Sequence, residues 1–312
     1  MLKYAAGFGS IHSMRLFSVA LFFVCYLARA FDPATQDDSL ALVRHFKKPT
    51  EPLKPFVDGA IAPNVGETIT LMGGTDVYQM HETCEFEISL HFWFPDKNLR
   101  FRNVSWPADT VYRQQRPMFF YTVKGDNREG SVPDQREKLE PGIFVLRFGR
   151  MESLDGLDRL DEFEKAYGRL LDALMEISPR ISLLRPVPFS KEGPAGTFAD
   201  ERNSVLAKYT ESIQKLADSR GILLSIDMSG FREAIRGVSV DSNLHARIRE
   251  KNKLWLQYYR PTNWAFLFGD RQHVPSSRDH KNTEHRWFVE ELEKIPPLIE
   301  KADEAIWKEV QR

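Results

Sequence analysis

Residues 67–90 constrain the fold of this chain more than any other stretch of the sequence. Residues 68–72 are a short β-branched and apolar run, which is typical of a buried parallel strand. Gly73 and Gly74 then permit a tight turn, and Thr75 is a candidate helix N-cap before apolar residues at helical spacing. This order predicts an α/β fold with the Thr75 hydroxyl at the carboxyl end of a sheet, where ligands bind in such folds.

The rest of the chain repeats this alternation of strand and helix. Four further apolar runs are predicted as strands, at residues 99–104, 143–148, 181–189 and 222–228. Amphipathic helices are predicted at residues 157–177 and 203–219, from residue 244 onward, and at residues 287–308 with an interruption at Pro296-Pro297. The alternation predicts a three-layer α/β sandwich, in which helices cover both faces of one five-stranded parallel sheet.

Composition narrows the classes of function. The 312 residues are 42% hydrophobic and 28% charged, which suits one large globular domain with extensions. A net charge of -1 predicts no nucleic-acid partner. The two cysteines, Cys25 and Cys84, cannot form a disulfide framework, and Cys84 is expected to pack on a helix. The sequence has no histidine and cysteine cluster with metal-ligand spacing and no glycine-rich phosphate loop, so we expect no metal and no cofactor.

The N-terminus is predicted to be a processing segment. Residues 16–27 form an apolar run that follows Arg15 and precedes Ala28-Arg29-Ala30. This arrangement predicts a signal peptide over residues 1–30, with cleavage after Ala30 and export to the periplasm or the extracellular space. The run is too short for a membrane-spanning helix, so no stable membrane anchor is expected. Residues 31–64 are rich in proline and are predicted to be a linker.

The stretch around Thr75 resembles the first motif block of the SGNH/GDSL-type hydrolases, an esterase family. In that block a hydrophobic strand leads to a glycine, an acidic or amide residue and the nucleophilic serine. This chain has Gly73-Gly74-Thr75-Asp76, so Thr75 occupies the serine position. Threonine keeps the hydroxyl but adds a methyl group and restricts χ1. The residues by themselves favour a helix cap, and the resemblance implies a nucleophile.

Two further blocks carry the resemblance, with substitutions at the oxyanion positions. Residues 103–110 resemble N-x-G-W-S-G-D-T, but Ser105 and Ala108 replace the two glycines. The resemblance implies that the backbone N–H of Ala108 donates to the oxyanion. The third block, G-x-N-D or G-x-N-E, is present as Gly149-Arg150-Met151-Glu152. Met151 therefore replaces an asparagine donor, and a thioether cannot donate a hydrogen bond.

No clean copy of the last family block, D-x-x-H, follows the fifth predicted strand. Asp241 and His245 are four residues apart rather than three, and His245 is expected to be a solvated residue of a helix. Asp279 and His280 are secondary candidates, but the side chains of adjacent residues diverge. A loop held by hydrogen bonds is therefore the favoured interpretation for Asp279 and His280.

The C-terminal run is the longest part of the resemblance. The segments RPTNWAFLFGDR (residues 260–271) and PSSRDH (residues 275–280) resemble an extension on a branch of SGNH-type proteins common in planctomycetes and their relatives. The family implies a flavodoxin-like fold with strand order 2-1-3-4-5. It also implies a hydrolase-like domain at residues 65–240 and a helical extension at residues 241–312 that packs on it. The role of the two segments and the oligomeric state remain open.

Two functions follow from the resemblance. The first is an esterase, for example on an acetylated carbohydrate, with Thr75 as nucleophile, the Ala108 N–H as oxyanion donor and His245 or His280 as base. The second is a non-catalytic member that binds a small ester or carbohydrate ligand or serves as a scaffold. The departures at Thr75, at the two loop glycines, at Met151 and at the base block favour the second.

Overall fold

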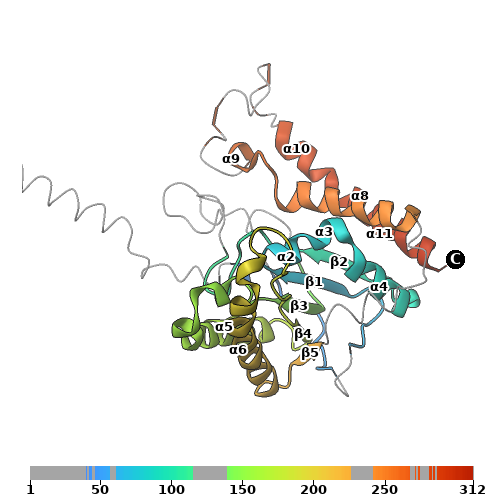
Figure 1. Cartoon of the computed structure of the whole chain (residues 1–312). Helices are drawn as coiled ribbons and strands as arrows, with labels where there is room; N and C mark the ends of the chain where they lie inside the picture. The colour runs from blue at the N-terminus through green and yellow to red at the C-terminus, as the bar shows by residue number, and fades with distance from the viewer. Residues whose placement is uncertain are drawn as a thin grey trace, which may run out of the picture. The chain divides into compact units, whose positions relative to one another are not determined.

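The computed structural model describes residues 40, 42–43, 46–56, 61–114, 139–225, 242–267, 271, 273–274, 281–282, 284 and 287–311. Five parallel strands form one sheet in the order β2-β1-β3-β4-β5 (Figure 1), which confirms the predicted α/β class and strand order. The strands are β1 (Thr68–Gly73), β2 (Arg100–Asn103), β3 (Ile143–Arg147), β4 (Ile181–Leu184) and β5 (Leu223–Ser225).

The winding of the chain changes direction next to β1. Ile69 of β1 lies opposite Phe101 of β2 on one side and Ile143 of β3 on the other. The chain first moves from β1 to β2 and then continues on the opposite side through β3, β4 and β5. The carboxyl ends of β1 and β3 therefore flank the topological switch point, the place where open α/β sheets bind ligands.

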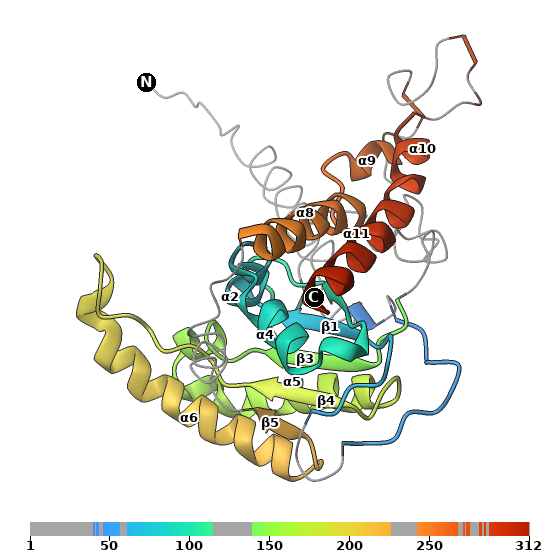
Figure 2. The ribbon, with the colours of Figure 1, turned by 90° about the vertical axis from the view of Figure 1, so that its right-hand side faces the viewer.

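Helices cover both faces of the sheet, as Figure 2 shows. On one face, α2 (Thr75–Tyr78), α3 (Met80–Thr83) and α4 (Glu85–Trp93) place Val77, Phe86 and Leu90 against Ile69 and Leu71. On the other face lie α5 (Leu160–Met175) and α6 (Ala199–Asp218), whose apolar residues pack with those of β3 in the main hydrophobic core. Short 3-10 helices in the described part of the chain include η2 (Pro95–Lys97), η4 (Glu152–Asp155), η5 (Leu157–Arg159) and η6 (Gly196–Phe198).

Three predicted elements differ from the observed ones. The helix after Thr75 is broken into three pieces, and Cys84 adopts a left-handed φ of 56° between α3 and α4. The strand predicted at residues 181–189 ends at Leu184, because prolines at 186 and 188 cannot continue a ladder of hydrogen bonds. Pro296 and Pro297 lie in the first turn of α11 (Ile295–Val310), where proline is tolerated, and α10 (Trp287–Glu293) ends before them.

The C-terminal helices α8 (Ser242–Tyr259) and α11 cover the open edge of β2. Carbonyl groups of this edge accept hydrogen bonds from their side chains: Trp307 Nε1 donates to Leu99 O at 2.9 Å, and Trp255 Nε1 donates to Asn103 O at 2.7 Å. Lys251 Nζ lies 3.4 Å from Phe101 O. An edge strand that is covered in this way cannot pair with another chain.

Two buried ion pairs fasten the same helices to the rest of the protein. Lys251 Nζ lies 2.7 Å from Glu87 Oε1, and Arg102 Nη2 lies 2.6 Å from Asp303 Oδ2. The helices belong to one compact unit with the sheet, residues 39–312. Among the residues that the structure describes, no helix has both the length and the apolar character needed to cross a membrane.

Candidate functional site

Thr75 is the second residue after β1, at the switch point of the sheet. It is the first residue of α2, and Gly74 occupies the N-cap position without any side-chain cap hydrogen bond. The expectation that the Thr75 hydroxyl caps this helix is therefore wrong. The hydroxyl oxygen instead accepts a hydrogen bond of 3.2 Å from the backbone N–H of Ala108. Thr75 and Ala108, separated by 33 residues in sequence, are thus brought into contact.

The turn from β1 into α2 requires glycine at its first position. A Cβ at Gly73 would overlap both the Val77 side chain and the Arg147 carbonyl oxygen of β3. Helix α2 therefore approaches β3 closely, because nothing projects between them. This approach places Thr75 beside the loop that follows β3, which carries Met151.

The loop after β2 holds Ala108 in a strained conformation. Its φ is +65°, in the left-handed region where a Cβ is disfavoured. The Asp109 carboxylate stabilises this turn by accepting the N–H of Trp106 at 3.0 Å. Ala108 thus takes up the backbone conformation of a glycine and directs its N–H toward the Thr75 hydroxyl.

Glu152 joins the loops that follow β2 and β3. One carboxylate oxygen accepts the N–H of Val111 and the other accepts the N–H of Gly149, both at 2.8 Å. Burial raises the pKa of Glu152 above its usual value, and the two N–H donors oppose that shift. Both oxygens are occupied by backbone groups, so this carboxylate holds the loops together.

Met151 and Arg147 complete the lining of the site. The Met151 side chain is 40% exposed at the position where the family resemblance implies an asparagine donor. The buried Arg147 side chain lies at the end of β3, with its Nη1 3.6 Å from Asp76 Oδ2. The sequence interpretation missed this pair, although a single charge at the end of an apolar strand was a signal for it.

These residues enclose a cavity of about 20 Å³. Its lining is polar and compact: Gly74, Thr75, Asp76, Asp109, Arg147, Phe148, Arg150, Met151 and Glu152. A cavity of this size holds about one water molecule, since a water needs at least roughly 10–15 Å³. Among the residues that the structure describes, no histidine lines the pocket. The described groups are one hydroxyl, one N–H donor and a paired arginine, with no histidine base beside the hydroxyl among them.

His245, the candidate base that the structure describes, does not line this cavity. His245 is in the first turns of α8, where the neighbouring Ile248 packs with Ile88 and Ile306. The other end of α8 reaches the carboxyl end of β2, where the Tyr259 hydroxyl donates to Val104 O at 3.1 Å. His245 and Tyr259 are fourteen positions apart on this helix, so about 21 Å of helix separates His245 from the carboxyl end of β2. Asp241, Asp279 and His280 lie outside the described residues.

His81 of α3 is buried on the face of the sheet that α2, α3 and α4 cover. Its Nδ1 lies 2.7 Å from Tyr78 O, an arrangement that requires an Nδ1–H donor, and its Nε2 is buried without a hydrogen-bond partner among the described residues. Burial lowers the pKa of His81 to about 4, so the ring is neutral at pH 7. It is not hydrogen-bonded to Thr75. Within the described part of the chain, no group of three or more histidine, cysteine or acidic residues is arranged to hold a metal ion.

No protein-family profile and no curated protein sequence matches this chain. Among solved structures, it is similar to Axe2, an acetylxylan esterase from Geobacillus stearothermophilus, at 15% identity over 56% of this chain and 83% of that chain, with a TM-score of 0.36. The acetyl xylan esterase AlAXEase gives 17% identity over 55% and 82%, with a TM-score of 0.37. LAE5, an α/β hydrolase from the metagenome of Lake Arreo, Spain, gives 13% identity over 78% and 97%, with a TM-score of 0.36.

Proposed function

We propose that this protein is an exported, non-catalytic relative of the SGNH/GDSL-type hydrolases, from the divergent branch with a C-terminal extension, and that it binds a ligand without cleaving it. The observation that carries this proposal is the contact between Thr75 and Ala108. The N–H expected to stabilise an oxyanion donates to the Thr75 hydroxyl itself, at 3.2 Å. The pocket beside the Thr75 hydroxyl is small, with a volume of about 20 Å³ that holds about one water molecule.

Acyl transfer needs more than the groups that are present here. A hydroxyl nucleophile requires a base within hydrogen-bond reach, and no histidine of the described part of the chain lines the Thr75 cavity. The side chain at position 151 is a thioether that cannot donate to an oxyanion. Loss of one such donor typically lowers the rate about 10²- to 10³-fold. Absence of the base removes most of the remaining acceleration.

An esterase that uses Thr75 is the second candidate, and one observation favours it. Thr75, Ala108 and Met151 are brought together at the carboxyl edge of the sheet, as a nucleophile and its oxyanion groups would be. The N–H of Ala108, which contacts the hydroxyl oxygen, also lies where it would contact the oxygen of an ester attacked by that hydroxyl.

Ester hydrolysis separates the two candidates. Wild type, Thr75→Ala and Thr75→Ser/Met151→Asn would be assayed side by side on 4-nitrophenyl acetate and on acetylated xylo-oligosaccharides. We expect all three to stay at the buffer background. Turnover that persists in Thr75→Ala would be non-specific surface reactivity and would leave the proposal intact. Robust wild-type turnover that disappears in Thr75→Ala would establish Thr75 as a nucleophile and reject the proposal.

A further inference from the structure

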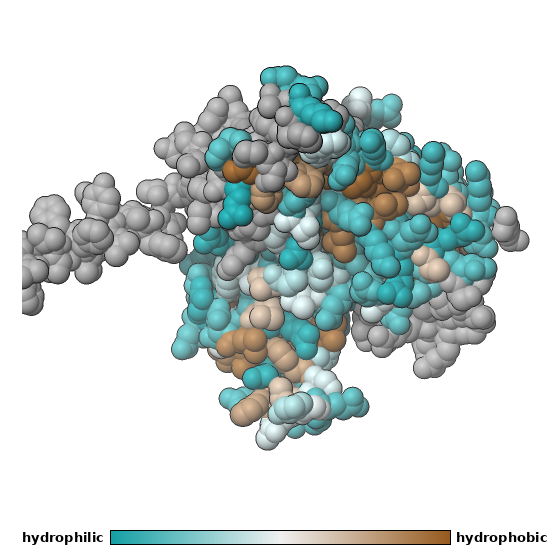
Figure 3. All heavy atoms as spheres, turned by 90° about the horizontal axis from the view of Figure 1, so that it is seen from above, coloured by the Kyte–Doolittle hydropathy of each residue, from teal (hydrophilic) through white to brown (hydrophobic). Residues whose placement is uncertain are grey.

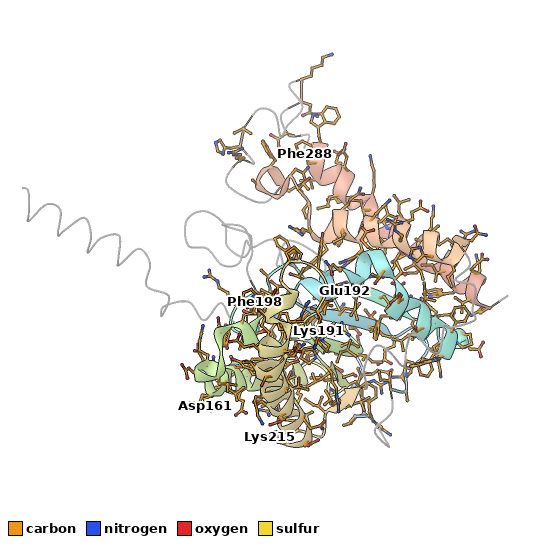
Figure 4. The ribbon with its side chains drawn as sticks, in the orientation of Figure 1. Asp161, Lys191, Glu192, Phe198, Lys215 and Phe288 are labelled. Atoms are coloured by element: carbon orange, nitrogen blue, oxygen red, sulfur yellow. The ribbon has the colours of Figure 1, made fainter. Side chains whose placement is uncertain are left out.

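A groove much larger than the Thr75 cavity lies among the C-terminal helices. Its volume is about 770 Å³, which is within the range of small-molecule sites. Apolar and aromatic side chains make up most of its walls, from α8, from α9 (Trp264–Leu267), and from α10 and α11: Leu256, Leu267, Phe288, Leu292 and Ile295. Figure 4 labels Phe288 on α10, and the view from above shows hydrophobic atoms exposed among hydrophilic ones (Figure 3).

Arg260 provides the positive charge of this groove. The residue is half-buried, and its guanidinium lies over the ring of Trp106, 4.3 Å from the centroid, and over the ring of Tyr78 at 5.6 Å. The guanidinium makes no hydrogen bond or ion pair with any residue that the structure describes. A guanidinium stays charged at all physiological pH values, so its partial burial is costly unless an anion compensates it.

Two buried arginines show one way in which this protein meets that cost. Arg102 pairs with Asp303 at 2.6 Å and Arg180 pairs with Glu67 at 2.8 Å. Each of these two guanidinium groups therefore carries its own internal carboxylate. Arg260 has two aromatic rings in the same role, and its hydrogen-bonding donors remain available to a group from outside the chain.

We infer that the groove binds a small amphipathic carboxylate, with its carboxylate paired to Arg260 and its apolar body against the groove wall. A planar guanidinium matches a carboxylate with two parallel hydrogen bonds, which gives both affinity and orientation. The apolar wall suits an alkyl or aromatic body. Glu291 also lines the groove and is exposed on α10.

This inference is independent of the proposed lack of catalysis at Thr75. Tyr78 ends the helix that Thr75 begins, so the groove starts one helical turn from the Thr75 cavity. No atom of the Thr75 cavity is needed to bind the carboxylate. A failure of ester hydrolysis and a failure of ligand binding would therefore be observed separately.

The test uses decanoate as the probe, measured by titration calorimetry and by tryptophan fluorescence below its critical micelle concentration. We expect saturable one-to-one binding to the wild-type protein. The uncharged 1-decanol should bind about tenfold or more weakly, because it lacks the charge-assisted hydrogen bonds. Binding of decanol as tight as that of decanoate, or no saturable binding of decanoate, would overturn the inference.

Variants locate the site. Arg260→Gln should weaken decanoate binding about tenfold or more, and Arg260→Lys should fall between it and wild type, since lysine keeps the charge but loses the planar fork. Arg249→Gln is the matched control, because Arg249 lies on the same helix in an exposed ion pair with Glu82. Unchanged binding in Arg260→Gln would reject the site.

A second variant covers the case in which Arg260→Gln does not fold, which its melting temperature would reveal. Gln257 lines the groove from an exposed position on α8, so Gln257→Trp narrows the groove without replacing a core residue. This variant should lose decanoate binding while its melting temperature stays close to that of wild type. Decanoate binding that survives in Gln257→Trp would also overturn the inference.

Discussion

The Thr75 cavity and the Arg260 groove flank the same short helix, α2, yet they differ in how their polar groups are satisfied. In the cavity, Glu152 accepts two backbone N–H groups and Arg147 faces Asp76, and about 20 Å³ remains. In the groove, the Arg260 guanidinium lies over two aromatic rings and has no ion pair with a described residue, and about 770 Å³ is open. A guanidinium that already faces an internal carboxylate, as Arg147 faces Asp76, offers less to a ligand than one that does not. A charge without an internal counter-ion leaves a favourable interaction for a molecule from outside.

The groove is formed by helices that two buried ion pairs hold against the sheet. Removing one of these pairs should cause the largest loss of stability among the substitutions considered. Burial opposes the ionisation of Glu87, but Lys251 and His91 outweigh it and hold the pKa of Glu87 below its usual value. Lys251→Ala would leave this carboxylate buried without its cation. We expect the free energy of unfolding to fall by roughly 3–5 kcal/mol, as measured by urea denaturation.

A double variant tests whether the loss comes from the unpaired charge. Glu87→Gln/Lys251→Met replaces both members of the pair, so it should recover much of the stability that Lys251→Ala loses. Lys251→Ala should also weaken decanoate binding, because the groove is built from these helices. The double variant should restore that binding, because the helices would again be held in place. A Lys251→Ala variant as stable as wild type would show that the C-terminal helices are held mainly by the tryptophan hydrogen bonds to β2.

The next effect concerns pH and the histidine beneath Tyr78. The pKa of His81 is lowered to about 4 in the folded protein from 6.5, so the unfolded chain binds a proton first as the pH falls. The stability from this group is present above pH 6.5 and is lost between pH 6.5 and about 4. The loss should approach about 3 kcal/mol, since one pKa unit corresponds to 1.36 kcal/mol.

Unfolding at several pH values checks this prediction. His81→Asn should remove most of the extra loss between pH 6.5 and 4, whereas the exposed His273→Asn should have no such effect. Identical pH profiles for wild type and His81→Asn would mean that His81 is not held neutral by burial.

The sequence was sufficient for the sheet but not for the contacts at its edge. The five apolar runs and the two amphipathic helices beside them are local patterns, and residues such as Phe163, Tyr167 and Leu171 are buried as their spacing predicts. The strand order followed from the family resemblance. Each residue just past a strand, including Thr75 and Met151, could be placed at the carboxyl edge because parallel strands end on one side.

What escaped prediction depends on contacts between residues far apart in the chain. In the sequence, Thr75 fits the local pattern of a helix N-cap. In the structure its hydroxyl instead accepts a hydrogen bond from Ala108, which lies on a loop whose course no local pattern predicts. The pair of Lys251 with Glu87 joins residues 164 positions apart. Both residues resemble ordinary surface charges in the sequence, because a charge pattern does not reveal which charges will be buried together.

Removing the hydrogen bond at Thr75 should lower the free energy of unfolding by less than Lys251→Ala or protonation of His81 does. Thr75→Ala removes the acceptor of the Ala108 N–H, but Ala108 is exposed and water can replace the hydroxyl. We expect a loss of about 0.5–1 kcal/mol in the free energy of unfolding. Thr75→Ser should keep the hydrogen bond and most of the stability. A loss above about 2 kcal/mol would exceed what an exposed hydrogen bond contributes.

The smallest expected effect concerns the strain at Ala108 and has the opposite sign. A residue with a Cβ loses roughly 1–2 kcal/mol in the left-handed region, and Ala108 lies there with φ of +65°. Ala108→Gly removes this strain, but glycine raises the conformational entropy of the unfolded chain, which costs about 0.4–1 kcal/mol. The net result should be a gain of about 0.5–1 kcal/mol, because the relief of strain exceeds this entropic loss.

A matched substitution separates strain from entropy. Ala207 is exposed within α6, so Ala207→Gly removes a Cβ without relieving left-handed strain and should lose about 0.5–1 kcal/mol. Chemical denaturation of both variants compares the two positions directly. If Ala108→Gly also loses stability, the loop around Ala108 is not strained in solution. In that case the Ala108 N–H is free to turn away from Thr75. The Thr75 cavity would then resemble the Arg260 groove in having a polar group without an internal hydrogen-bond partner.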